Sequence, residues 1–101
     1  MKPYANEAVI LLTNAIIFFL KEKNEASALH YIDVANQLYL TEEQVYERLL
    51  IKCLSSIKKI ILNDSKGYEE ITIYLKIMET LEMNNLLEMF NSLLSELKTI
   101  Y

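Results

Sequence analysis

The sequence predicts an all-α domain of five helices, arranged as an antiparallel bundle or as stacked helical hairpins. Apolar residues recur at spacings of three and four along nearly the whole chain, which is the period of an amphipathic helix. The 101 residues include one glycine and one proline, whereas strand-and-turn folds need far more of both. Two helix-capping sequences, Thr41 with Gln44 and Asn85 with Glu88, mark helix starts. At this length, residues 1–101 form a single domain with a modest core.

The composition favours a chain that buries apolar surface against a partner. Hydrophobic residues make up 52% of the sequence, and the formal charge of −4 gives no attraction to nucleic acid or anionic lipid. The apolar run Ala8–Leu20 is shorter than the roughly 20 residues of a membrane span, so we expect a buried helix and neither a span nor a signal peptide. The lone Cys53 fits a reducing compartment, and we expect a cytoplasmic protein.

The first two helices are separated by a short polar segment. The first is predicted over Tyr4–Glu22, with Pro3 near its start, where a missing N–H is harmless. Over Val9–Leu20 it has almost no polar face, so we expect it to be buried on most sides, at the centre of the fold or in a subunit interface. The second helix is predicted over Glu25–Tyr39, and Asn24 is its expected N-cap.

The third helix is predicted over Glu42–Leu62, after a very short break. In this interpretation Thr41 caps the helix, and Gln44 completes the capping box three residues later. Leu40 and Val45 are spaced to pack on one another as a hydrophobic staple.

The remaining helices follow the clearest predicted loop, residues 63–67, which reads Asn-Asp-Ser-Lys-Gly. The fourth helix is predicted over Tyr68–Met83 and the fifth over Leu86–Ile100. The apolar residues of the fifth helix alternate in spacing between four and three, which is the step of a coiled-coil seam. They are Leu86, Phe90, Leu93, Leu97 and Ile100.

No combination of residues predicts catalysis, a metal site or a cofactor. His30 and Cys53 fall on different predicted helices, and Cys53 lies on an apolar stripe where a small buried side chain is the default. No pair of residues has the spacing of a metal site, and a phosphate-binding loop needs more than one glycine. The sequence therefore predicts a protein that is not an enzyme.

Residues Asp33–Leu49 resemble a bacterial helix-turn-helix, which makes DNA binding an alternative function. Apolar residues occupy the apolar positions of the motif. However, Tyr39 stands where glycine usually permits the tight turn, and Arg48 stands where a core residue is usual. The recognition face also carries three glutamates, which phosphates repel. They are Glu42, Glu43 and Glu47. Nucleic acid is therefore disfavoured as a partner.

Other features resemble helical-repeat proteins. Ala28 and Ala35 give one helix the small residues of tetratricopeptide-type repeats. Three short sequences and a final amphipathic helix carry a narrower resemblance: Tyr-Glu-Arg at 46–48, Lys-Gly-Tyr-Glu-Glu-Ile at 66–71 and Leu-Glu-Met-Asn-Asn-Leu at 81–86. They resemble the C-terminal repeat domain of peptide-pheromone-responsive regulators of the Rgg/MutR type. The resemblance implies a domain that binds a short peptide and makes a dimer, while a separate N-terminal domain, not part of this sequence, binds DNA.

We therefore expect a non-enzymatic, possibly regulatory module that binds a peptide, a helix of another protein or a second copy of itself. A small helical inhibitor or immunity protein of phage or plasmid origin is a further alternative. A homodimer is expected because the apolar faces of the first and last helices exceed what the chain itself covers. The predicted partner or dimer surface comprises Phe18, Phe19, Phe90, Leu94, Leu97 and Tyr101.

Overall fold

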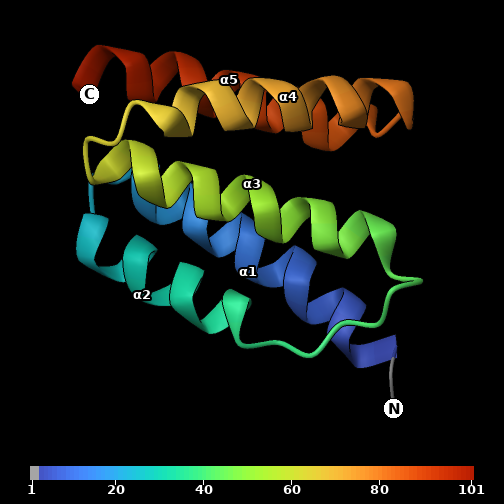
Figure 1. The fold of residues 1–101 in the computed structure, drawn as a ribbon. Coiled ribbons are helices and arrows are strands. Elements are labelled where there is room, and N and C mark those ends of the chain that lie inside the picture. The colour runs from blue at the N-terminus through green and yellow to red at the C-terminus, as the bar shows by residue number, and fades with distance from the viewer. Residues whose placement is uncertain (1–2) are drawn as a thin grey trace.

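Five helices and their connections make up the described part of the chain (Figure 1). The computed structural model describes residues 3–101, with side chains described from Glu7 onward. The helices are α1 (Pro3–Lys21), α2 (Glu25–Asn36), α3 (Val45–Ile61), α4 (Lys66–Thr80) and α5 (Asn84–Ile100). Residues 3–101 contain no strand, and the predicted all-α class with five helices is confirmed.

Three of the four connections reverse the chain with the same backbone motif. Lys23, Asn63 and Glu82 each follow a helix in the left-handed region, with φ of 60°, 65° and 59°. The N–H of the following residue then reaches back five residues to a helix carbonyl. These bonds join Asn24 to Phe19 at 2.8 Å, Asp64 to Lys59 at 2.8 Å and Met83 to Met78 at 3.0 Å. This helix ending, usually made with glycine, turns α1 onto α2, α3 onto α4 and α4 onto α5.

The second helix is shorter than its apolar pattern predicts. The expected N-cap is confirmed, because Asn24 Oδ1 accepts the Ser27 N–H at 3.2 Å. The helix ends at Asn36 and not at Tyr39, which is 80% exposed. The Asn36 side chain donates to the carbonyl of Ile32 at 3.1 Å and accepts from the Ser55 hydroxyl of α3, also at 3.1 Å. The bond from Ser55 joins the end of α2 to α3.

The prediction that the third helix begins at Glu42 is wrong. The Gln44 side chain accepts the Thr41 N–H at 2.9 Å, which is one half of a capping box. The Thr41 hydroxyl does not form the other half, because it lies 3.4 Å from the same Gln44 oxygen. The helix therefore begins after Gln44, and Val45 is 54% exposed and not buried in a staple.

The starts of α4 and α5 also differ from the capping predictions. α4 begins at Lys66, inside the predicted loop, because Asp64 Oδ1 accepts the Lys66 N–H at 3.0 Å. α5 begins at Asn84, and no side chain caps its first turn. The predicted capping by Asn85 is therefore wrong, and the reversal at Glu82 sets this helix start instead.

The core lies between all five helices, and α1 contacts α2, α3 and α5. In an open stack of repeats each unit contacts only its neighbours, so the contact between α1 and α5 closes the fold toward a bundle. α1 is buried less completely than predicted, because Leu11 and Phe18 remain 68% and 58% exposed. Among residues 3–101, no helix is both long enough and apolar enough to cross a membrane.

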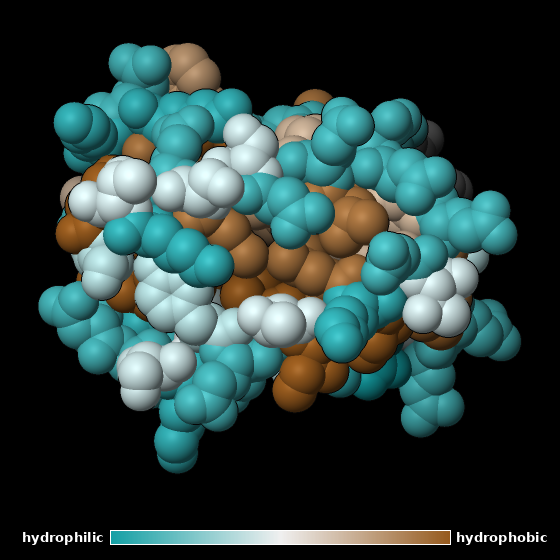
Figure 2. All heavy atoms as spheres, turned by 90° about the horizontal axis from the view of Figure 1, so that it is seen from above, coloured by the Kyte–Doolittle hydropathy of each residue, from teal (hydrophilic) through white to brown (hydrophobic). Residues whose placement is uncertain are grey.

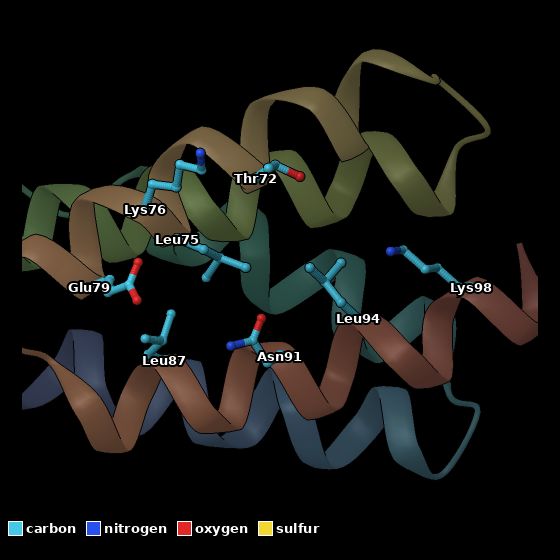
Figure 3. A pocket seen from close by; sticks show the side chains of 8 residues that line it. All are labelled: Thr72, Leu75, Lys76, Glu79, Leu87, Asn91, Leu94 and Lys98. Carbon is cyan, nitrogen blue, oxygen red and sulfur yellow. The ribbon is translucent and has the colours of Figure 1, made fainter.

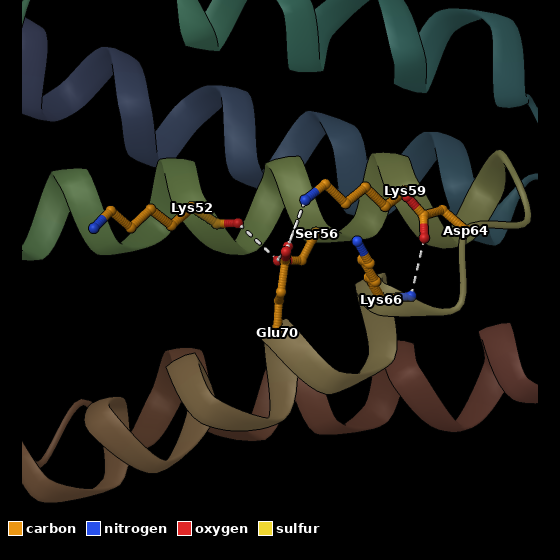
Figure 4. A network of polar contacts seen from close by, with 6 residues as sticks. All are labelled: Lys52, Ser56, Lys59, Asp64, Lys66 and Glu70. Carbon is orange, nitrogen blue, oxygen red and sulfur yellow. Dashed lines mark hydrogen bonds and ion pairs between the residues drawn. The ribbon is translucent and has the colours of Figure 1, made fainter.

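The tightest helix pair is α3 with α4, and a polar cluster lies along it (Figure 4). Lys59 Nζ donates to both oxygens of Glu70, at 2.9 and 2.7 Å, and this bonding raises the pKa of the Lys59 ammonium. The Ser56 hydroxyl lies 3.1 Å from the Lys52 carbonyl and 3.4 Å from Glu70. Gly67 lies one turn before Glu70, where the backbone of α4 is so close to α3 that an added Cβ atom would lie 2.7 Å from the Ser56 carbonyl oxygen.

Candidate functional site

The structure divides the six residues of the predicted partner surface between the core and the exterior. Phe90 and Leu97 are at most 2% exposed, so their packing within the chain removes them from a free surface, and Leu94 is 8% exposed. Phe19 and Tyr101 are half-buried, and Phe19 stacks on Tyr31 with ring centroids 5.5 Å apart. Phe18 remains 58% exposed, and its ring packs edge-on against that of Phe19 with centroids 5.7 Å apart. Phe90 and Leu97 pack in the core, where α4 and α1 contact α5, whereas Leu94 lines a hollow between α4 and α5.

Cys53 and His30 are held in different environments. The Cys53 side chain is fully buried on α3, and this burial raises the pKa of its thiol to about 12. His30 is exposed on α2, with its ring 5.1 Å from the ring of Tyr31 in an edge-on contact. A nucleophilic cysteine needs a lowered pKa and access to solvent, and Cys53 has neither.

Cys53 is therefore expected to react with iodoacetamide at least about tenfold more slowly in the folded protein than in urea, at pH 8. The raised pKa leaves little thiolate in the folded state, and unfolding returns the thiol to its ordinary value. Mass spectrometry of the alkylated chain over time measures both rates. Equal rates would contradict the burial of this side chain.

The helix-turn-helix interpretation of Asp33–Leu49 is wrong. That motif joins its helices by a turn of three or four residues, whereas here residues 37–44 separate α2 from α3. Val45, which the motif places in its core, is exposed, and Glu47 is buried to 8% exposure in its place.

A groove lies on the surface between α4 and α5. It encloses about 290 Å³, at the small end of the range for ligand sites. Its floor is apolar and is formed by Leu75 of α4 with Leu87 and Leu94 of α5. Figure 2 looks down on these two helices and shows apolar side chains framed by polar ones. α4 and α5 contact each other far less than α3 and α4 do, and the groove lies between them.

The charged residues around this groove differ between its two ends (Figure 3). Glu79 lies at the end near Leu87, and Lys98 lies at the opposite end. Asn91 projects between them from the middle of α5, facing Leu75 across the groove. Thr72 and Lys76 complete the α4 side. The site thus combines an apolar floor, a central amide, Lys98 toward one end, and Glu79 with Lys76 toward the other.

A second hollow, of about 280 Å³, lies between the start of α3 and α4. Val45, Leu49 and Ile77 form its apolar walls, and Glu42, Arg48 and Lys52 place charges of both signs beside them. This hollow is therefore a second candidate for binding a partner.

Of the residues that line this groove, only Leu94 belongs to the partner surface that the sequence predicted. The lining residues of α5 that carry the groove, Leu87, Asn91 and Leu94, follow one another at spacings of four and three. This spacing places them on one face of the helix. The apolar stripe through Phe90 and Leu97 is more regular than the spacing of the groove residues. The prediction therefore included these two residues, which lie on the buried face of α5.

The family model of the HTH-type transcriptional regulator Rgg, C-terminal domain, matches residues 1–92 of this chain. The match covers most of the 101 residues and confirms the resemblance to Rgg-type regulators. Comparisons with curated proteins and with solved structures find no match.

Proposed function

This chain belongs to the family of Rgg C-terminal domains, a family of transcriptional regulators, and we propose that it is a non-enzymatic module that binds a short peptide between α4 and α5. The observation that carries the proposal is the groove with Leu75, Leu87 and Leu94 on its floor. Apolar side chains at the base of a groove favour a ligand that buries its own apolar side chains there.

The length of the groove suits a few extended residues. α5 follows it from Leu87 to Lys98, which at about 1.5 Å per residue is roughly 16 Å. At about 3.3 Å per residue, that distance accommodates roughly five residues of extended peptide. Because side chains alternate in an extended peptide, every second one points toward the floor, while the Asn91 amide can bond to the peptide backbone.

The charges at the two ends favour one direction of binding. Lys98 attracts a carboxylate, and Glu79 attracts an ammonium group, at opposite ends of the groove. A short peptide with free ends carries one of each. We therefore place its C-terminus beside Lys98 and its N-terminus beside Glu79.

Asn91→Trp is expected to reduce peptide binding at least about tenfold without loss of stability. Asn91 is exposed and points into the groove, so an indole at this position fills the space above Leu75. The probe is a synthetic five-residue peptide that alternates leucine with serine and has free ends, titrated by isothermal calorimetry. Ser92→Trp is the matched control, since Ser92 is exposed on α5 but does not line the groove.

A second experiment tests the direction in which the peptide binds. A C-terminal amide on the same peptide should weaken binding several-fold, and Lys98→Met should abolish that difference between acid and amide. Binding that survives Asn91→Trp but is lost on Arg48→Glu would place the peptide in the hollow between α3 and α4 and contradict the proposal.

A further inference from the structure

The hollow between α3 and α4 has apolar side chains that recur once per helical turn. Val45 and Leu49 lie one turn apart on α3, and Ile77 lines the same hollow from α4. Val45 and Ile77 are 54% and 41% exposed. Ile73, one turn before Ile77 on the same side of α4, is 58% exposed. In the described part of the chain, each helix of the pair therefore presents exposed apolar surface beside the hollow.

The basic residues of this hollow differ in their bonding from Lys59, which lies farther along α3. Lys59 is paired with Glu70 of α4, and its Nζ lies 2.7 Å from the Glu70 Oε2. Arg48 and Lys52 form no such ion pair with the side chains described in residues 7–101. The Lys52 ammonium points away from Glu70, toward the start of α3 (Figure 4). Two positive charges one turn apart thus lie beside exposed apolar surface, which favours a partner that brings carboxylates.

We propose that this hollow docks an amphipathic helix of another protein, whose apolar face covers Val45 and Ile77. Two carboxylates of that helix, one turn apart, pair with Arg48 and Lys52. Glu42 lines the hollow from the connection before α3, and a basic residue of the docked helix pairs with it there. The charges that the partner carries beside the hollow are thus mainly negative.

The shape of the hollow suits a helix. Two neighbouring helices leave a groove along their line of contact, and a third helix packs there with its side chains between those of both walls. From Val45 to Lys52, α3 rises by about 10 Å at about 1.5 Å per residue, so the docked segment spans roughly two turns. The helix dipole favours acids in the first turn of a helix and bases in the last. The N-terminus of the docked helix therefore lies beside Lys52, and the helix runs antiparallel to α3.

This surface is separate from the groove between α4 and α5, because the two sets of lining residues are different. The proposal therefore does not rest on the proposed function. Two turns of helix bury little area, and we expect a dissociation constant of about 10–100 µM.

The test uses two synthetic helical peptides of fifteen residues, each titrated into the full chain by isothermal calorimetry. The acidic probe has leucines spaced by three and four, two glutamates one turn apart near its N-terminus and a lysine near its C-terminus. The basic probe exchanges these charges. The acidic probe should bind at least about tenfold more tightly at low salt, where exposed ion pairs are least screened.

Arg48→Glu together with Lys52→Glu should reverse this preference, so that the basic probe binds more tightly than the acidic one. A gain of binding requires a folded hollow, so it cannot come from unfolding of the variant. Lys21→Glu together with Lys66→Glu is the matched control, because both lysines are exposed and lie outside the hollow. This control changes the net charge equally and should leave the preference as it was.

Ile77→Glu should weaken binding of the acidic probe at least about tenfold, because it places a charge within the apolar contact. Leu11→Glu is its control, since Leu11 is exposed on α1. Circular dichroism checks that both variants remain helical, and the charge exchange decides the question even where one of them unfolds.

No binding of either probe at about 1 mM would overturn the proposal. A preference that Arg48→Glu with Lys52→Glu leaves unchanged would overturn it as well. Binding that is lost on Asn91→Trp and kept on Ile77→Glu would place the helix between α4 and α5 and contradict the proposal. If sedimentation shows that Ile77→Glu converts a dimer into monomers, the occupant is a second copy of the chain, and the proposal is equally wrong.

Discussion

Phe90→Ala is expected to destabilise the fold by about 3–5 kcal/mol, because it removes an aromatic ring from a position with no exposed surface. The neighbouring helices cannot close fully over the space, so the loss of burial is joined by the cost of a cavity. In a domain of this size each kcal/mol lowers the midpoint of thermal unfolding by roughly 4–8 °C. Urea unfolding followed by circular dichroism, at protein concentrations low enough to favour monomer, measures the change.

Tyr39→Ala is the matched control for this experiment. It also truncates a large aromatic side chain, but one that is 80% exposed, so the free energy of unfolding should change by less than about 0.5 kcal/mol. If Phe90→Ala instead left stability intact and altered only self-association, Phe90 would belong to a partner surface and the observed packing of α5 would be wrong.

Gly67→Val is expected to destabilise the protein by at least about 3 kcal/mol, and Gly67→Ala by about 1–3 kcal/mol. A Cβ atom at this position meets the carbonyl oxygen of Ser56 at 2.7 Å and the backbone N of Ile60 at 2.9 Å. Both are backbone atoms of α3, so no side-chain rotation relieves the contact. α4 must therefore move away from α3, which strains the bonds between Lys59 and Glu70.

The decisive observation is whether Gly67→Ala raises or lowers the free energy of unfolding. Replacing an exposed glycine within a helix by alanine raises the free energy of unfolding by roughly 0.5–1 kcal/mol, because alanine has the higher helix propensity. A gain of that size would show that α4 does not approach α3 closely here. Ser65→Ala serves as the control, since Ser65 is exposed and its side chain makes no capping bond to α4.

The sequence by itself determined the class of the fold and most of its elements. Continuous apolar spacing of three and four, with a single glycine and a single proline, is incompatible with a sheet and sufficient to place five helices. It also placed Asn24 at the start of α2 and Cys53 in the core. These features depend on side-chain periodicity and on local hydrogen bonding, which nearby residues determine.

Helix ends were less predictable, because several are fixed by backbone geometry or by distant partners. Lys23 and Glu82 take the left-handed conformation that glycine usually supplies, so composition gave no signal of these turns. The end of α2 depends on Ser55, which lies 19 residues along the chain from Asn36. The apolar pattern predicted that α2 continues through Tyr39, because nothing in the nearby sequence marks Asn36 as the end of the helix.

Only the tertiary structure decided which apolar residues face outward. The sequence shows that α1 and α5 have more apolar surface than one neighbour covers, but it cannot say which side another helix takes. The contacts of α1 and α4 with α5 bury Phe90 and Leu97, and they leave Leu11 and Phe18 exposed on α1. The groove above Leu75 and Leu87 likewise exists because α4 and α5 pack less closely than α3 and α4. Such choices depend on how whole helices are placed, since periodicity fixes the faces of each helix but not the neighbour that each face meets.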